Sequence, residues 1–412
     1  MRRATALAAL LLFAACGDRQ RVEYDGPFAG DVRAAMTKIE RITGTPFKEP
    51  PRVATRPRSE LRAILEQEFA DKEGVNLPLQ ERAYRVFGVL PASVDLRALL
   101  LDLLVEQVMG FYLPADTTLY LVDDVPGQVR EFLITHELVH ALQAQYLNLD
   151  SIQRIERQDD RQMAAQAVLE GQAQFVAMRG LGSFASVEQQ RTAIRRSQSE
   201  MPEFAAAPLF VQEMLIFPYL SGNEFVRQFL DSMPGESLYD AGVMPTSTEQ
   251  LLYWTRYAGE RDAPTHVELP APRSGTAVYD NTLGEFGTRL LLFIHARDQA
   301  LSLGGAQGWD GDRYVLIRTP RGDGLAWVTI WDSTVDAAEF GTAMRRAIDR
   351  RFYEPAARRL PDGSTTFDTG ERALRLWGGE IAGRPAVLYV DMPAGEGTDV
   401  VGLEGVRLQE QD

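Results

Sequence analysis

The sequence predicts an α+β protein, with a mainly helical first part that contains a small edge sheet, followed by an α+β lobe at the C-terminus. From residue 59 to about 231, apolar residues recur mostly at helical spacing. Within this part, the stretch "GFYLPADTTLYLVDD" (110–124) has two short aromatic and branched runs around Pro114-Ala115-Asp116, which predict a hairpin. After residue 304 the order of elements becomes strand, strand, helix, strand, strand.

The composition is that of a globular protein. The chain has 412 residues, of which 45% are hydrophobic and 25% are charged, and these values exclude a mainly disordered chain. The formal net charge is −15. Because binding to a nucleic-acid duplex needs a basic face that displaces counterions, we expect no nucleic-acid partner.

The N-terminal stretch "MRRATALAALLLFAAC" has the layout of a secretory signal peptide, and its apolar run is too short to span a bilayer. The residues Phe13-Ala14-Ala15-Cys16 resemble the lipobox of bacterial lipoproteins, which implies that Cys16 is lipid-modified and becomes the mature N-terminus. The expected location is the bacterial cell envelope, with the protein anchored to a membrane by lipid on the periplasmic or surface face. The alternative is a plain secretory signal (1–16) with a chance cysteine.

Residues 17–58 are predicted to be a tether and linker. They include a short amphipathic helix at 31–44 that ends at Gly44. The segment 45–58 contains four prolines and cannot be helical, so it is either a linker or an edge strand.

The main helices are predicted where apolar residues recur every three or four positions between helix-capping and helix-ending residues. The predicted ranges are 59–74, 77–90, 93–110, 127–147, 160–178, 187–199 and 207–231. Residues 149–162 are polar and charged, which predicts a solvated connection. Residues 232–280 are rich in Pro, Gly, Ser and Thr, which predicts extended surface loops around short helices.

The C-terminal lobe is predicted over 305–412. Aromatic and branched runs predict strands, antiparallel where they adjoin, at 313–320, 325–333, 372–379 and 384–393, and a helix at 335–352. The stretch "GWDGDRY" (308–314) lacks the full ligand set of an EF-hand loop, so a tight turn is favoured over a calcium site formed by Asp310 and Asp312. Glu285 at a helix start and His295 in a helix are interpreted as structural.

The stretch "EFLITHELVHALQAQY" (131–146) holds two of the four histidines of the chain. Residues four apart lie one turn above each other on a helix, so His136 and His140 can direct both rings at one point and bind zinc at about 2.0–2.1 Å. Glu137 projects toward the same side and is placed to take a proton from a zinc-bound water, as in the H-E-x-x-H arrangement. The alternative is a buried helix that matches this short pattern by chance.

Glu170, in "AVLEGQAQF", is the candidate for the third ligand, because a catalytic zinc usually has three protein ligands. A carboxylate on a core-facing stripe of alanines is costly unless it is paired or binds metal, and its neighbours on the stripe are Ala167, Ala173 and Ala177. The alternative for Glu170 is a solvent-facing side chain. Three acidic residues of the charged segment 149–162 are competing candidates for the third ligand, namely Glu156, Asp159 and Asp160.

The combination "HELVH … LEG" is similar to the gluzincins, the zinc peptidases of the thermolysin type. More narrowly, residues 60 to 350 look like a little-characterised family of secreted bacterial proteins of this zincin class, through the motifs "GFYLPADTTLYLV", "THELVHALQAQY", "VLEGQA", "FPYLSGNEFV", "PTSTEQLL", "TLGEFG" and "GWDGDRY". The resemblance implies a zincin-like metallopeptidase domain over 59–304, in which His136, His140 and Glu170 hold Zn²⁺ and Glu137 is the base. It also implies that the edge strand before the helix binds the substrate backbone.

The sequence departs from the thermolysin type at two points. The spacing to the third ligand is longer, and Gln174 stands where that type has an Asp that orients a histidine. Gln174 can still accept an N–H hydrogen bond from a ligand histidine, but it adds no negative charge.

The predicted function is hydrolysis of peptide bonds in a peptide or protein substrate, with a zinc-activated water and Glu137 as general base. The developing oxyanion needs a hydrogen-bond donor, for which Tyr219 is the first candidate and His266 the second. One alternative is a catalytically weak or inactive zincin-fold envelope lipoprotein that acts as a binding or scaffold protein. Another is a structural lipoprotein without metal.

Overall fold

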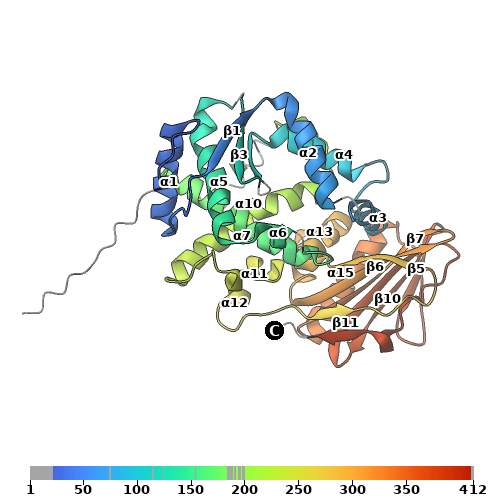
Figure 1. Cartoon of the computed structure of the whole chain (residues 1–412). Helices are drawn as coiled ribbons and strands as arrows, with labels where there is room; N and C mark the ends of the chain where they lie inside the picture. The colour runs from blue at the N-terminus through green and yellow to red at the C-terminus, as the bar shows by residue number, and fades with distance from the viewer. Residues whose placement is uncertain are drawn as a thin grey trace, which may run out of the picture.

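The computed structural model describes residues 22–409, apart from 74–75, 114–115, 124, 154 and most of 183–199. The fold is α+β, as predicted, with helices in the first two thirds of the chain and a large antiparallel sheet in the last third (Figure 1). No helix in the described part combines the length and the apolar character needed to span a bilayer. The predicted signal peptide with Cys16 and most of the helix predicted at 187–199 lie outside the described residues.

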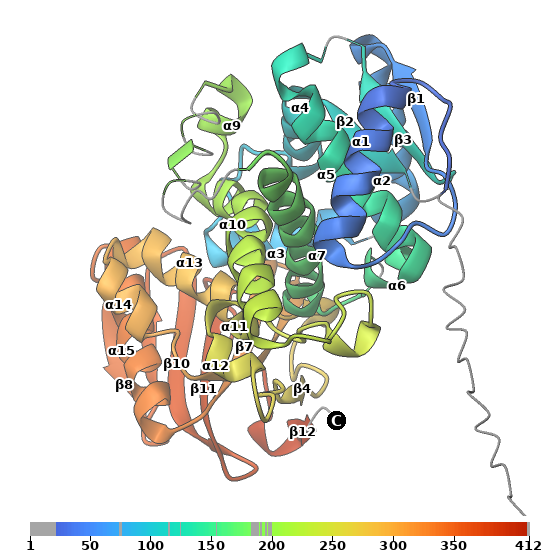
Figure 2. The same ribbon diagram turned by 90° about the vertical axis from the view of Figure 1, so that its left-hand side faces the viewer.

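Three long helices form the centre of the helical part. They are α5 (Gly127–Tyr146), α7 (Asp159–Gly180) and α10 (Leu209–Ser232), and α7 lies between the other two (Figure 2). The remaining helices of this part are α1 (Ala29–Thr43), α2 (Arg58–Glu73), α3 (Leu77–Phe87), α4 (Leu96–Gln107), α6 (Leu149–Gln153) and α9 (Pro202–Ala206). The helices predicted from apolar spacing in this part are therefore present wherever the structure describes them.

Over the described residues, 22–58 form an integral part of the helical domain, so the prediction of a tether is wrong there. Of the two alternatives for the segment 45–58, a linker or an edge strand, the structure has the edge strand, at Arg52–Arg56. Helix α1 ends at Gly44, as predicted, which has a left-handed φ of 70°. Its apolar face packs on α5 and α7 and buries Val32, Ala35, Met36 and Ile39. The apolar spacing of this segment predicts the helix, but it does not show which surface the helix covers.

A small sheet lies beside α5 and has the strand order β1-β3-β2. Its strands are β1 (Arg52–Arg56), β2 (Gly110–Leu113) and β3 (Thr118–Val122). Strands β2 and β3 form the predicted antiparallel hairpin, with Gly110 opposite Leu121 and Leu113 opposite Thr118. Strand β1 comes from the proline-containing segment and runs parallel to β3. Among the described residues, strand β2 is therefore a free edge of this sheet.

A seven-stranded antiparallel sheet forms the C-terminal part, in the order β5-β6-β7-β11-β10-β9-β8. Its strands are β5 (Thr276–Asn281), β6 (Trp309–Thr319), β7 (Gly322–Trp331), β8 (Ala356–Arg359), β9 (Thr365–Asp368), β10 (Arg372–Ile381) and β11 (Arg384–Pro393). The helices α13 (Gly284–Ala296), α14 (Gln299–Gly304) and α15 (Thr334–Arg351) pack on one face (Figure 2). A two-stranded sheet of β4 (His266–Glu268) and β12 (Arg407–Gln409) lies beside it, and the short helix η2 (Leu403–Gly405) precedes β12.

The sheet is buried on both faces along β6, β7 and β11, which explains the apolar runs in these strands. One face joins the core of the helical part, since Phe87 at the end of α3 contacts Tyr314 and Trp327 edge-to-face with ring centroids 5.2 and 5.5 Å apart. Strand β5 also pairs with β6, although it lies before the predicted boundary at 304/305. The two predicted domains therefore share one core, and the sheet begins about thirty residues earlier in the sequence than predicted.

The segment 232–280 contains η1 (Ala241–Val243), α11 (Thr248–Leu252), α12 (Trp254–Tyr257), β4 and β5. It is not a set of surface loops throughout, because residues 247–250 are buried. The Thr248 backbone N–H and hydroxyl both donate to the carboxylate of Asp160, and Glu249 Oε1 lies 3.6 Å from Arg256 Nε. Asp160 itself is buried rather than part of a solvated connection.

Candidate metal centre

The three residues that the sequence proposes as ligands converge on one point. His136 and His140 lie on α5, and Glu170 lies on α7. The Nε2 atoms of His136 and His140 are 3.4 and 3.5 Å from Glu170 Oε2, and one ligand atom from each residue lies within 4.8 Å of the other two. Zinc bonds of about 2.0–2.1 Å in a tetrahedral site put neighbouring ligand atoms roughly 3.4 Å apart. The two distances to Glu170 match the edges of such a tetrahedron.

The carboxylate of Glu170 is held on one side and open on the other. Its Oε1 accepts a hydrogen bond from Gln166 Nε2 at 2.8 Å. Its Oε2 is buried and, among the described residues, has no hydrogen-bond partner. Burial opposes ionisation, but the two histidines hold the pKa of Glu170 below its usual range. A buried acceptor atom of this kind is costly unless a cation meets it, so the donor set fits a divalent metal ion.

The close contact of α7 and α10 depends on two glycines. A Cβ on Gly171 would lie 2.1 Å from the carbonyl carbon of Gly222, and a Cβ on Gly222 would lie 1.8 Å from the carbonyl oxygen of Ala167. The two backbones therefore touch one residue after Glu170. This contact brings Tyr219, one turn earlier on α10, to the candidate centre.

His140 is oriented by Gln143, a residue that the sequence does not identify. The Nδ1–H of His140 donates to Gln143 Oε1 at 2.8 Å, in the tautomer that leaves Nε2 free to face Glu170. The amide of Gln143 is in turn fixed, because its Nε2 donates to Leu169 O at 3.0 Å and to Gln172 Oε1 at 2.9 Å. Such partners set the ring orientation and raise the basicity of a ligand histidine.

Gln174 does not take the orienting role predicted for it. Its side-chain amide faces Met178 Sδ, one turn further along α7, at 3.6 Å. The reason is that Gln143 reaches His140 from the same helix, three residues on, and is fully buried between α5 and α7.

Glu137 lies beside the three candidate ligands, in a cavity of about 210 Å³ that they line together. Its side chain is buried, and burial raises the pKa of its carboxyl, an effect that the neighbouring histidines oppose. A hydrogen bond from the backbone N–H of Tyr112 also favours the charged form. Glu137 is thus placed next to the centre without being one of the three converging groups, which is the position of a proton acceptor.

Tyr219 reaches the same cavity, and His266 does not. The ring of Tyr219 lies nearly parallel to that of His136, with the centroids 6.2 Å apart. The negative charge of Glu170, together with burial, raises the pKa of Tyr219 well above its usual value, so its hydroxyl stays a donor. His266 lies on β4, opposite Gln409 of β12, and lines a different hollow, so the structure does not bring it to the centre.

Strand β2 turns free backbone groups toward the cavity. The N–H of Val122 donates to Met109 O at 3.0 Å, which fixes that pair as hydrogen-bonded. Since hydrogen-bonded and non-hydrogen-bonded pairs alternate in an antiparallel ladder, Gly110 and Tyr112 direct their backbone groups away from β3. Both residues line the cavity, where the N–H of Tyr112 bonds Glu137.

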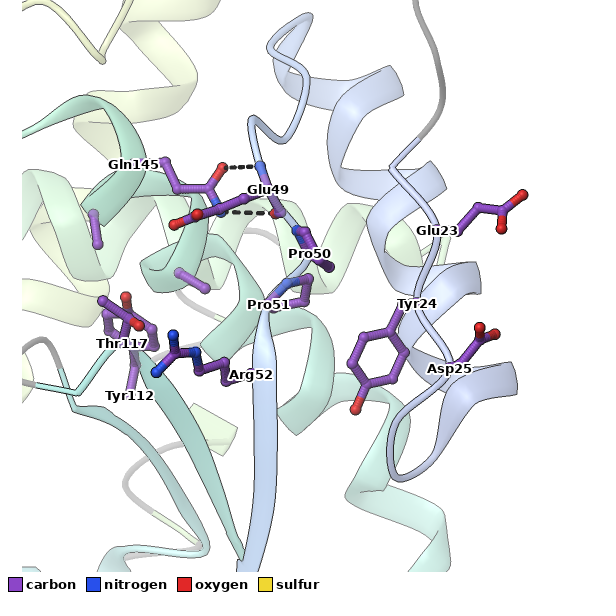
Figure 3. A pocket seen from close by; sticks show the side chains of 12 residues that line it. Glu23, Tyr24, Asp25, Glu49, Pro50, Pro51, Arg52, Tyr112, Thr117 and Gln145 are labelled. Atoms are coloured by element: carbon purple, nitrogen blue, oxygen red, sulfur yellow. Dashed lines mark hydrogen bonds between the residues drawn. The ribbon is translucent and has the colours of Figure 1, made fainter.

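A larger hollow of about 410 Å³ adjoins the centre further along α5 (Figure 3). Tyr112 lines both this hollow and the 210 Å³ cavity of the candidate centre. The side chain of Arg52, at the start of β1, points toward Tyr112. The side chain of Gln145 fixes the segment before β1, since it accepts from the backbone N–H of Glu49 at 3.4 Å and donates to the Glu49 carbonyl at 3.0 Å. The larger hollow and the 210 Å³ cavity at the candidate centre therefore share Tyr112 as a wall.

The other candidate acids and histidine have structural partners. Asp310 accepts from Thr265 Oγ1 and Arg384, both at 2.6 Å, and Asp312 accepts from the backbone N–H groups at the start of α13 and from two tryptophans. Both lie in strand β6, so the predicted tight turn is wrong. As interpreted from the sequence, Glu285 lies at the start of α13, paired with Arg289, and His295 Nε2 bonds Phe87 O at 2.8 Å.

The acidic ligand candidates that compete with Glu170 also lie elsewhere. Asp159 accepts from Gln80 at 2.5 Å, Asp160 is bonded to Thr248, and Glu156 is exposed. Within the described residues, one further acidic group has metal-like spacing, formed by Glu249, Asp262 and Asp332. These three carboxylates surround the guanidinium of Arg256, which already supplies the cation.

One family model matches part of the chain. Residues 273–386, which include most of the C-terminal sheet, match a family described as Domain of unknown function (DUF8575). No curated protein and no solved structure matches the chain. The match lies outside α5 and α7, so it does not include the candidate metal centre.

Proposed function

We propose that the protein is a zinc-dependent metallopeptidase of the gluzincin type. The observation that carries the proposal is the position of Glu170 Oε2, which is buried, has no hydrogen-bond partner among the described residues, and lies 3.4 and 3.5 Å from the two histidine Nε2 atoms. His136, His140 and Glu170 would hold the ion. A bound zinc ion supplies Lewis-acid polarisation of a carbonyl and of water.

The residues around the ion have separate tasks in peptide hydrolysis. Glu137 accepts the proton of the attacking water and passes it to the leaving amine. Tyr219 donates its hydroxyl to the oxyanion that develops on the scissile carbonyl, a task suited to a phenol whose pKa is raised. Gln143 keeps His140 in the tautomer that presents Nε2.

Strand β2 is the proposed binding edge for the substrate. An extended peptide that pairs with the free backbone groups of Gly110 and Tyr112 would add a strand to the small sheet and cross the cavity. Besides the polar groups of the candidate centre, Val108, Leu149 and Leu169 supply apolar side chains to the lining of this cavity. We therefore propose that the substrate carries an apolar side chain next to the bond that is cleaved.

The test compares zinc-loaded wild-type protein with Glu137→Gln on a mixture of unstructured peptides, followed by mass spectrometry. The variant keeps all three candidate ligands, so it should retain zinc and lose cleavage by about 10²- to 10⁴-fold, the usual contribution of a general base. Glu131→Gln is the matched control, since Glu131 lies on the same helix, is exposed and pairs with Lys38. If wild type cleaves no peptide while it binds zinc, the alternative of a binding or scaffold protein is favoured.

Attachment to the cell envelope is a second part of the proposal. It rests on the lipobox-like residues that end at Cys16. Expression of the full chain and of Cys16→Ala in a bacterial host tests it, because the variant should lose both lipid labelling and the membrane fraction. Retention of Cys16→Ala in that fraction would contradict lipid anchoring.

A further inference from the structure

A third hollow, of about 270 Å³, lies where the helical part meets the C-terminal sheet. It is lined by Arg82, Arg85 and Val86 of α3, Asp323 of β7, Arg351 at the end of α15 and Arg372 at the start of β10. We call it the arginine cavity. It shares no lining residue with the 210 Å³ cavity at the candidate metal centre. Four guanidinium groups around one hollow stand out in a chain whose net charge is −15.

The carboxylates that pair with these arginines do not balance their charge. Arg82 pairs with Asp323 through two contacts, Arg85 pairs with Glu81 at 2.8 Å, and Arg372 pairs with Asp391 at 2.6 Å. Within the described part of the chain, Arg351 has no carboxylate of its own, because its nearest one is Asp391, at 3.6 Å, which already pairs with Arg372. Three carboxylates therefore face four guanidinium groups, and one positive charge remains.

Neutral groups take up the rest of the hydrogen bonding. Arg351 donates to the backbone carbonyls of Phe87 and Val86 at 3.1 and 2.9 Å. Arg85 donates to the carbonyl of Val94 at 2.7 Å, while its Nε is buried without a partner among the described residues. In the same part of the chain, Arg82 uses Nε and one terminal nitrogen for Asp323 and makes no other hydrogen bond. Donors and charge both remain in excess.

We propose that the arginine cavity binds a small phosphate-type oxyanion. Guanidinium groups present paired N–H donors in a planar fork that fits phosphate oxygens. The ligand would neutralise the remaining positive charge. It would also accept hydrogen bonds from the guanidinium groups of the arginines on α3, α15 and β10. The cavity volume admits a phosphate that carries a small organic group, so a soluble phosphomonoester and the phosphodiester of a lipid headgroup share the required chemistry.

An oxyanion bound in this cavity would join the two parts of the molecule. Arg82 and Arg85 belong to the helical part, whereas Arg351 and Arg372 belong to the sheet. Because the ligand binds the native arrangement of these elements and not the unfolded chain, it should raise the unfolding temperature in a saturable way. Binding needs neither zinc nor peptidase activity, so it is tested independently of the proposed function.

The experiment titrates the full chain with inorganic phosphate, glycerol phosphate and glycerophosphoglycerol at constant ionic strength. Calorimetry and thermal unfolding measure the response. We expect saturable binding that Arg85→Gln weakens by about tenfold, since a charge-assisted hydrogen bond contributes roughly one factor of ten or more. Asp323→Asn should bind more tightly, because it removes a carboxylate that competes with the ligand. Preference for the monoester would identify a soluble phosphate as the source, and preference for the diester would identify a lipid headgroup.

The control is Arg273→Gln, which removes an exposed arginine paired with Asp399 and Glu404 outside the cavity. This variant should bind phosphate as wild type does. The absence of saturable binding to wild type would overturn the proposal, and so would an equal response in wild type, Arg85→Gln and Asp323→Asn. The last two variants shift binding in opposite directions, so loss of folding in one of them cannot imitate the predicted pattern.

Discussion

Replacement of Gln143 by leucine is the sharpest perturbation of the candidate centre that leaves every candidate ligand in place. Leucine has a similar size and suits a fully buried position. The substitution removes the acceptor of the His140 Nδ1–H at 2.8 Å and the two hydrogen bonds that Gln143 donates to Leu169 and Gln172. His140 then lacks the partner that fixes its tautomer and ring orientation.

The size of the effect follows from the role of such partners. Loss of a hydrogen-bond partner of a ligand histidine weakens metal binding by about 10- to 100-fold. That factor corresponds to about 1.4–2.7 kcal/mol of binding free energy. The same substitution leaves the side-chain oxygen of Gln172 without its donor, so the metal-free protein should also lose about 1–3 kcal/mol of stability.

The assay is a competition between the protein and a chelator of known zinc affinity, combined with denaturant unfolding of the metal-free protein. Gln174→Leu is the matched control, because the side-chain amide of Gln174 faces Met178 Sδ and, among the described residues, makes no hydrogen bond to either histidine. Gln174→Leu should bind zinc as wild type does. The reasoning is refuted if Gln143→Leu keeps wild-type zinc affinity, or if Gln174→Leu shows the larger loss.

Three further outcomes are expected. Tyr219→Phe should retain zinc and lower kcat by about 10²- to 10³-fold with little change in KM, the usual loss for one oxyanion donor, and steady-state kinetics measures both values. Gly222→Ala should lower both the free energy of unfolding, by about 1–3 kcal/mol, and the zinc affinity, since its Cβ would overlap α7, whereas the control Gly341→Ala, with nothing within 4 Å, should not destabilise. Burial raises the pKa of Asp160 to about 7, so its contribution to stability is complete below pH ~4 and is lost as the pH rises toward about 7. Denaturant unfolding of Asp160→Asn across this range should show a smaller fall than wild type, and equal slopes would contradict the buried state of this carboxyl.

The parts of the centre that depend on one helix can be predicted from the sequence. His136 and His140 are four residues apart, which is about one helical turn, so the sequence alone predicts that their two rings lie close together. Glu170 is predictable because a carboxylate in a stripe of alanines needs a partner. The hairpin of β2 and β3 is likewise local, with a short turn between two apolar runs.

Other features depend on contacts between elements, which the sequence does not show. The packing of α5 against α7 decides that Gln143, and not Gln174, orients the ring of His140. Strand β5 has a register shift between Ala277 and Tyr279 and lies among turn-forming residues, so it lacks a regular alternation. Strand β8 is exposed along its whole length and carries no apolar pattern. The core that joins α3 to the sheet forms through Phe87, whose contact with Trp327 is remote in sequence.

Metal analysis of the purified full chain and of two ligand variants tests the central claim most directly. After equilibration with zinc and removal of excess metal, wild type should hold one zinc ion per chain, and Glu137→Gln should hold the same amount. His140→Ala and Glu170→Ala should hold none while circular dichroism shows that they remain folded. A wild-type chain that retains no zinc, or a folded Glu170→Ala chain that retains it fully, would contradict a centre built from α5 and α7.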